Sequence, residues 1–217
     1  MMDKSKTVIL GSGVSGIGAV KLAQKKGLEI FLSDSKNIKS ETKKLLSKLE
    51  VKYEESGHTE KLIKDSKEII ISPGIDLRSL IKSKPSLKKK KIISEVEFAS
   101  RYTNAFIIAV TGTNGKTTTS KLIYHILKNS GFNVGLAGNI GYSFSESIVE
   151  NQFDYYVLEV SSFQLDHIIN FRPDISIITN ISPDHLDRYD NKLESYAESK
   201  FNIIRNQKSS DFFIYNG

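Results

Sequence analysis

AFIIAVTGTNGKTT, residues 105–118, joins an apolar strand to a glycine-containing loop and then to the start of a helix. Gly112 and Gly115 free the backbone to wrap its amides around phosphate, and Lys116 follows where its charge can neutralise the β- and γ-phosphates. Thr117 can then ligate magnesium. A valine stands where the strict G-x-x-x-x-G-K-[ST] pattern has its first glycine, so the loop is a shortened variant. We predict an ATP site made of Gly112, Thr113, Asn114, Gly115, Lys116, Thr117 and Thr118.

Apolar bursts alternate with segments of helical period along the whole chain, which is typical of parallel strands joined by crossover helices. Strands are expected at 7–10, 28–32, 51–54, 68–71, 91–93, 105–110, 133–137, 154–159, 174–179 and 211–215. The fold class predicted is α/β, with a Rossmann-like N-terminal domain followed by a P-loop-type mononucleotide-binding α/β domain. We place these domains at residues 1–102 and 103–217, and we expect the second to be truncated because the sequence stops where its next loop would begin.

Composition narrows the function classes. The 217 residues contain no cysteine, which excludes disulfides and thiolate metal sites and fits a reducing, cytoplasmic setting. No stretch approaches the roughly 20 apolar residues of a membrane span. The net charge of +6 comes mainly from lysines scattered among acids, so we expect neither a nucleic-acid nor a membrane partner.

A second glycine motif lies near the N-terminus. Gly11, Gly13 and Gly16 make G-x-G-x-x-G between a strand and a helix, and Asp34 follows the next strand, where a dinucleotide-binding fold places the acid that holds a ribose hydroxyl. By themselves these residues fit NAD, but the same glycines also serve to pack a helix against a strand or to bind another nucleotide.

Polar residues follow several later strands. Glu159 ends the strand at 154–159, where phosphate-loop enzymes hold a metal with an acid, although it could instead cap the next helix. Asp184, His185 and Asp187 cluster just past the strand at 174–179 and can reach the same cation. We therefore predict a metal site at this edge of the second sheet.

Two turns reach the carboxyl edges of the sheets. Ser72-Pro73-Gly74 follows the strand at 68–71, and Asn139 in GNIG follows the strand at 133–137. Ligands of open α/β sheets bind at such edges, but both segments also fit ordinary turns. The residues alone leave these alternatives open.

TGTNGKTT, GNIG, LEVSSFQL, NISPDHLDRY and YAESK, in that order, resemble the Mur ligases of peptidoglycan synthesis. The similarity extends over the whole chain. LEVSSFQL, residues 158–165, is the most specific phrase and is similar to the D-glutamate-adding branch of the family.

The resemblance implies that the first domain holds the uridine diphosphate of a nucleotide sugar, so that the glycine motif does not bind NAD. The residues that match positions around the uridine nucleotide are Val14, Ser15, Asp34, Ser35, Lys36 and Gly74.

The resemblance also assigns roles around the ATP site. Lys116 would bind ATP phosphates and Thr117 the first Mg²⁺, while Glu159 and His185 would hold a second Mg²⁺. Lys200 matches a lysine whose carbamate completes that metal site. Asn139, Ser161 and His185 would contact the muramoyl-alanine end of the substrate. The catalytic set implied is Lys116, Glu159, His185 and Lys200, with Thr117, Glu159, His185 and Lys200 around metal.

The reaction that the resemblance implies is the ATP-dependent addition of D-glutamate to UDP-N-acetylmuramoyl-L-alanine through an acyl phosphate, with ATP and Mg²⁺ as cofactors and a monomeric protein. Family members carry a further C-terminal domain that receives the amino acid, so we expect this chain to bind the nucleotide sugar without ligating. The alternatives are an NAD-binding regulatory or oxidoreductase module and a basic nucleic-acid-binding ATPase.

Overall fold

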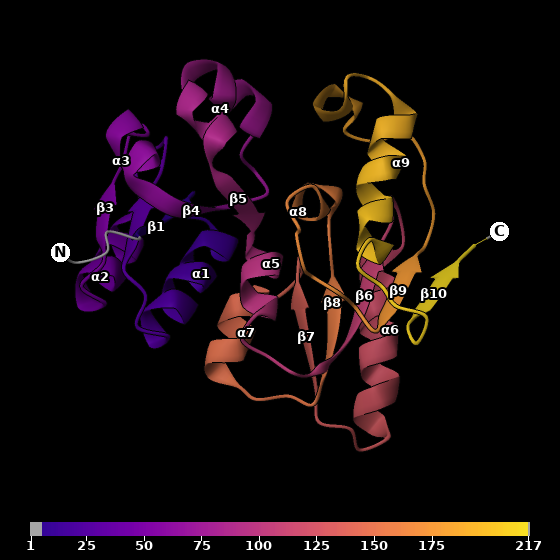
Figure 1. Cartoon of the computed structure of the whole chain (residues 1–217). Helices are drawn as coiled ribbons and strands as arrows, with labels where there is room; N and C mark the ends of the chain where they lie inside the picture. Colours follow the sequence, from indigo (N-terminus) through magenta and orange to yellow (C-terminus); the bar gives the residue numbers. More distant parts are fainter. Residues whose placement is uncertain (1–5, 217) are drawn as a thin grey trace.

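The computed structural model describes residues 6–216, which form two parallel sheets with helices around them (Figure 1). The strands are β1 Lys6–Leu10, β2 Ile30–Ser33, β3 Lys52–Glu54, β4 Ser66–Ile71, β5 Lys91–Ser94, β6 Phe106–Thr111, β7 Val134–Gly138, β8 Tyr155–Glu159, β9 Ile175–Ile178 and β10 Phe212–Tyr215. The α-helices are α1 Val14–Lys25, α2 Ser40–Lys48, α3 Glu60–Asp65, α4 Leu77–Ser83, α5 Glu95–Ser100, α6 Lys116–Asn129, α7 Phe144–Glu150, α8 Ser162–Leu165 and α9 Leu193–Phe201. Short 3₁₀ helices are η1 Pro85–Lys89, η2 Leu186–Tyr189 and η3 Asn202–Ile204.

All ten predicted strands are confirmed, with ends that differ by no more than two residues. The first sheet has the strand order β3-β2-β1-β4-β5, the order of one half of a Rossmann fold plus its neighbouring strand. The second has the order β10-β9-β6-β8-β7. Because every pairing is parallel, the carboxyl ends of the strands in each sheet meet at one edge. The predicted α/β fold class is therefore confirmed.

The two sheets are joined through a helical layer in which α1, α5 and α7 pack together (Figure 1). A Cβ on Gly18 would come within 1.8 Å of Ser143 Oγ, so glycine is what lets α1 approach the start of α7. One cluster of buried apolar side chains runs through this layer, from Ile9 in β1 to Leu158 in β8. The predicted boundary at 102/103 falls between α5 and β6 and stays a prediction, because the core continues across it.

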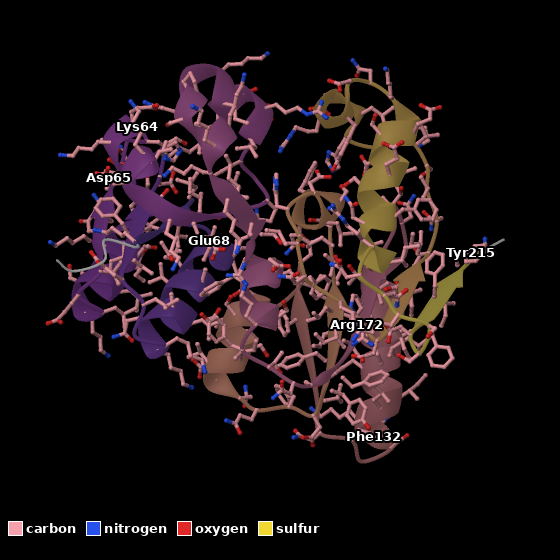
Figure 2. All side chains as sticks on the ribbon, in the orientation of Figure 1. Lys64, Asp65, Glu68, Phe132, Arg172 and Tyr215 are labelled. Carbon is pink, nitrogen blue, oxygen red and sulfur yellow. The ribbon has the colours of Figure 1, made fainter. Side chains whose placement is uncertain are left out.

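Charged side chains of α5 are also buried in this layer. One carboxylate oxygen of Glu97 accepts backbone N–H bonds from Ile169, Asn170 and Phe171 at 3.0, 2.9 and 2.7 Å. Arg101 forms a bidentate pair with Glu68, which is labelled in Figure 2 (2.7 and 3.1 Å). The segment between α8 and β9 is thus tied to α5 by hydrogen bonds to a side chain.

The outer strand β10 presents apolar side chains to solvent. Phe212, Ile214 and Tyr215 are exposed on it, and Tyr215 is labelled at this edge in Figure 2. Within residues 6–216, we find no helix with the length and apolar character needed to cross a bilayer.

Candidate active site

The loop between β6 and α6 adopts the conformation that its glycines permit. Gly115 is left-handed at φ 80° and precedes the first turn of α6, whose amides therefore point out of the helix N-terminus. Gly112 has φ 146°, and a Cβ there would lie 1.9 Å from Thr179 Oγ1. Both glycines are required by the backbone, and the result is a helix N-terminus that favours an anion.

The β9 end holds this loop in place. The backbone amide of Thr113 donates to Asn180 O at 2.9 Å, and that of Asn114 donates to Asn180 Oδ1 at 3.0 Å. Thr179 Oγ1 donates to Asn114 O at 2.7 Å, and Ser182 N donates to Thr113 Oγ1 at 3.0 Å. Sequence reasoning missed these supporting residues, although Asn180 and Ser182 lie within the phrase NISPDHLDRY.

Glu159 lies beside the loop because β8 pairs with β6, with Glu159 opposite Val110. Its carboxylate is buried and accepts a hydrogen bond from Thr117 Oγ1 at 2.7 Å and from Asn139 Nδ2 at 2.9 Å. Three predicted site residues, from the turn after β7, the end of β8 and the start of α6, thus meet at one carboxylate.

Two lysine ammonium groups converge on the loop. Lys116 Nζ donates to the carbonyls of Gly112 and Thr113 at 2.9 and 2.7 Å, and Lys200 Nζ donates to Gly112 O at 2.8 Å. Lys200 is only 1% exposed, and its ammonium lies 4.3 Å from the centre of the Tyr196 ring. Burial, and then the charge of Lys116, lower the pKa of Lys200 to about 8.

His185 lies at a strained position in the loop between β9 and η2. Its backbone is left-handed at φ 49°, and its ring lies 5.5 Å from that of Phe163. Its Nε2 is 3.7 Å from Asp184 Oδ2. Within residues 6–216, no three His, Cys, Asp or Glu side chains stand close enough to hold a metal. The shared metal site of His185, Glu159 and Lys200 therefore stays a prediction.

The chemistry around Glu159 does fit a cation. Its buried carboxylate receives hydrogen bonds only from a hydroxyl and an amide, and no ion pair to it occurs among the described residues. A buried charge without a counter-charge is costly, and a bound Mg²⁺ would supply one through oxygen ligands.

A first cavity, of about 450 Å³, lies over the N-terminal glycine loop. Asp34 organises its floor, because its carboxylate accepts from Ser12 N and Ser12 Oγ, both at 2.6 Å, and from Lys36 N at 2.8 Å. Burial raises the pKa of Asp34, but the hydrogen bonds from Ser12 and Lys36 outweigh it and lower that pKa. Ser12 is a residue that sequence reasoning missed. The predicted residues that line this cavity are Val14, Ser15, Asp34, Ser35, Lys36, Gly74 and Asn139.

A second cavity, of about 380 Å³, adjoins the first. Pro73, Gly74 and Asn139 line both, so the two cavities meet at the turn after β4 and at the GNIG turn. The predicted residues that line the second cavity are Gly74, Lys116, Asn139, Ser161, His185 and Lys200. The tertiary structure thus connects the N-terminal glycine loop to Lys116, at the end of the second glycine loop, by one groove.

The remaining predicted residues lie around this groove in different ways. Ser161 caps α8 in a capping box with Gln164, and it also lines the second cavity. Thr118 is exposed on the first turn of α6 and lines neither cavity. Gly112, Thr113, Asn114, Gly115 and Thr117 also line neither cavity, and the part of every residue of this loop in an ATP site stays a prediction.

Comparison with known families identifies both halves of the chain. Residues 6–81 match the MurD N-terminal domain, and residues 110–217 match the Mur ligase middle domain. The UDP-N-acetylmuramoylalanine--D-glutamate ligase of Porphyromonas gingivalis is 50% identical over 216 residues, which cover 99% of this chain and 48% of the relative. That of Bacteroides thetaiotaomicron is 50% identical over 210 residues, 97% of this chain and 47% of the relative. The chain spans about half the length of these relatives.

Solved structures agree on the fold. A UDP-N-acetylmuramate:L-alanyl-gamma-D-glutamyl-meso-diaminopimelate ligase from Neisseria meningitides superposes with a TM-score of 0.58 at 20% identity, covering 98% of this chain and 71% of that one. A UDP-N-acetylmuramate-alanine ligase from Thermotoga maritima has a TM-score of 0.56 at 22% identity, over 96% of this chain and 48% of that one. The predicted resemblance is confirmed, and the chain belongs to the Mur ligase family, with an N-terminal domain of the MurD type.

Proposed function

We propose that this chain is the part of an ATP-dependent D-glutamate ligase that binds UDP-N-acetylmuramoyl-L-alanine and presents its carboxylate to ATP. The observation that carries the proposal is the continuous groove, in which the two cavities share Pro73, Gly74 and Asn139. A nucleotide sugar fits this layout because its nucleotide end and its acyl end need two adjoining sites. The proposal includes a monomeric protein in the cytoplasm.

The first cavity is suited to uridine diphosphate. Its floor is the glycine loop, where α1 begins and its N-terminal amides favour a diphosphate. Lys36 adds a positive charge at the rim, while Asp34 keeps the loop in shape through Ser12. This arrangement supports substrate-binding roles for Val14, Ser15, Asp34, Ser35, Lys36 and Gly74.

The second cavity is suited to the reacting groups. Lys116, Asn139, Ser161 and His185 line this cavity, which supports a role for Lys116 in neutralising ATP phosphates and for the other three in orienting the acyl end of the nucleotide sugar. Thr117 and Glu159 would hold Mg²⁺, joined by His185 and a carbamylated Lys200, and such ions would offset the charge on the phosphate oxygens. The loop of residues 112–118 supplies the amides that surround those phosphates.

The proposed reaction joins two anions. The alanine carboxylate attacks the γ-phosphorus of ATP, the bond to the bridging oxygen breaks, and ADP leaves. The amine of D-glutamate then attacks the acyl carbon, loses a proton and expels phosphate, which leaves an amide. Catalysis rests on holding a carboxylate against a triphosphate, and Lys116 reduces that repulsion.

Ligand-dependent stability tests the proposal against its alternatives. At about ten times its dissociation constant, UDP-N-acetylmuramoyl-L-alanine should stabilise the chain by roughly 1.4 kcal/mol, which is a rise in Tm of about 3–6 °C. NADH and a single-stranded oligonucleotide should give no rise. Lys36→Ala, inside the cavity, should weaken binding on the order of fivefold, and Lys39→Ala, which lies outside it, should not. Stabilisation by NADH or the oligonucleotide alone would overturn the proposal.

Carbamylation of Lys200 has its own test. With a pKa of about 8, roughly half of the amine is neutral at pH 8 but about 1% at pH 6, and only the neutral amine adds CO₂, losing a proton as it does so. We expect a carbamate carbon signal in ¹³C NMR with labelled bicarbonate and Mg²⁺ at pH 8, and a much weaker one at pH 6. The signal should vanish in Lys200→Arg. A signal of equal strength in that variant would assign the carbamate elsewhere.

A further inference from the structure

Arg188 connects the metal-site side of the groove to the nucleotide-sugar side. It lies in η2, three residues after His185, and lines the second cavity. Its guanidinium NH2 donates to Ile75 O at 3.0 Å, and its Nε lies 3.8 Å from Asp76 Oδ1. Ile75 lines the first cavity in the turn that follows β4. One side chain therefore bridges loops that are 113 residues apart in sequence.

The same guanidinium also packs against the residues around His185. It lies 4.6 Å from the centre of the Phe163 ring, which is a cation–π geometry. Phe163 lies 5.5 Å from the ring of His185 and is stacked on Tyr189 at 5.9 Å with a 5° angle between the planes. Arg188 thus contacts the Ile75 turn on one side and, through Phe163, the His185 loop on the other.

A second arginine, Arg78, also links the segment after the turn at 72–76 to the loop at 184–190, but it is more exposed than Arg188. Arg78 NH1 lies 2.7 Å from Asp190 Oδ1, but these side chains are 57% and 67% exposed, whereas Arg188 is 24% exposed. An exposed ion pair between flexible side chains contributes little and orients little. The Arg188 guanidinium is partly buried, bonded to a backbone carbonyl and packed on an aromatic ring. These contacts restrict its side chain to a single orientation.

We propose that Arg188 is a positioning residue that couples the two half-sites, so that ordering of the turn at 72–76 by a uridine nucleotide also orders the loop at 184–190. The inference rests on the proposed function. The coupling element is the contact path from the Ile75 carbonyl through the guanidinium and Phe163 to His185. Because Arg188 fixes the distance between the turn and the loop, restricting one restricts the other.

Amide hydrogen exchange with UDP as the probe tests this coupling. UDP carries only the uridine diphosphate that we assign to the first cavity, and a Lys116→Ala background weakens its binding at the phosphate loop. In this background UDP should slow exchange at residues 11–16 and 34–36 and, by at least threefold, at residues 184–190. Arg188→Ala should keep the first effect and lose the second. Arg188→Lys should restore part of it, because lysine keeps a donor for Ile75 O but not the planar group over Phe163.

Arg78→Ala is the matched control and should leave both effects unchanged. If Arg188→Ala lowers the Tm too far for comparison, Asp76→Asn replaces it, since asparagine keeps the cap of α4 and removes the charge that faces Arg188. That variant should weaken the effect at 184–190. The inference would be overturned if UDP failed to slow exchange at residues 184–190 in the background protein, or if it still slowed exchange there in Arg188→Ala. Equal loss of the effect in Arg78→Ala would overturn it as well. Failure of UDP to slow exchange at residues 11–16 in the background protein would contradict the proposed function instead.

Discussion

Replacement of Lys116 by alanine is expected to weaken the binding of Mg·ATP by about 2–3 kcal/mol, or on the order of 30- to 150-fold. The loop around it is otherwise held by backbone and side-chain bonds from Asn180 and Thr179, so the loop shape should survive the change. What is lost is the ammonium that the first residue of α6 places beside the carbonyls of Gly112 and Thr113. Isothermal titration with Mg·ATP measures the effect directly.

Lys121→Ala is the matched control, because it removes the same charge from an exposed position on the same helix, α6. It should change the dissociation constant less than twofold, and neither variant should alter binding of UDP at the first cavity. In a longer form of the protein that ligates, Lys116→Ala should abolish ATP-dependent phosphate release. Equal losses of Mg·ATP affinity in the two variants would mean that general charge, not the loop, attracts the nucleotide.

Replacement of Glu97 by alanine is expected to lower the free energy of unfolding by about 3–5 kcal/mol. The carboxylate is fully buried and accepts three backbone amides, so its removal leaves the donors of Ile169, Asn170 and Phe171 without their partner. Such a loss is large against the roughly 5–15 kcal/mol by which domains are stable. Urea unfolding, followed by circular dichroism, measures it.

Glu97→Gln separates the hydrogen bonds from mere packing, because its side-chain oxygen still accepts those amides. It should cost about 1–2 kcal/mol, less than half the loss of the alanine variant. Glu194→Ala, an exposed carboxylate at the start of α9, should cost less than about 0.5 kcal/mol. A loss below about 1 kcal/mol in Glu97→Ala would show that water replaces the carboxylate without penalty.

The strands were predictable because burial on both faces leaves a continuous apolar run, as in FIIAV of β6. The meeting of Thr117 and Glu159 was also predictable, since Thr117 follows β6 and Glu159 ends the parallel neighbouring strand β8. Lys200 was assigned only by resemblance. The burial of Lys200, its pKa of about 8 and its bond to Gly112 O all depend on how α9 packs. No local sequence pattern predicts them.

Other site contacts depend on parts of the chain that are distant in sequence. The bond from Arg188 to Ile75 joins a loop of the second half to a turn of the first, and the packing of α1, α5 and α7 holds those halves together. The bond from Ser12 to Asp34 required the glycine loop to lie against the end of β2. No spacing or periodicity in the sequence predicts either hydrogen bond. Both depend on how the helices and strands that carry these loops pack together.

Sequence by itself determined the two glycine loops, the ten strands, the α/β class and the family, since each is encoded in local spacing and in phrases such as LEVSSFQL. Only the tertiary structure decided that the N-terminal glycine loop and Lys116 lie along one groove. Gly18 lets α1 pack closely on Ser143, just after the GNIG turn, and Asn139 of that turn lines both cavities together with Gly74. The physical reason is that local periodicity determines where helices and strands form, whereas the close packing of their faces determines which loops come together.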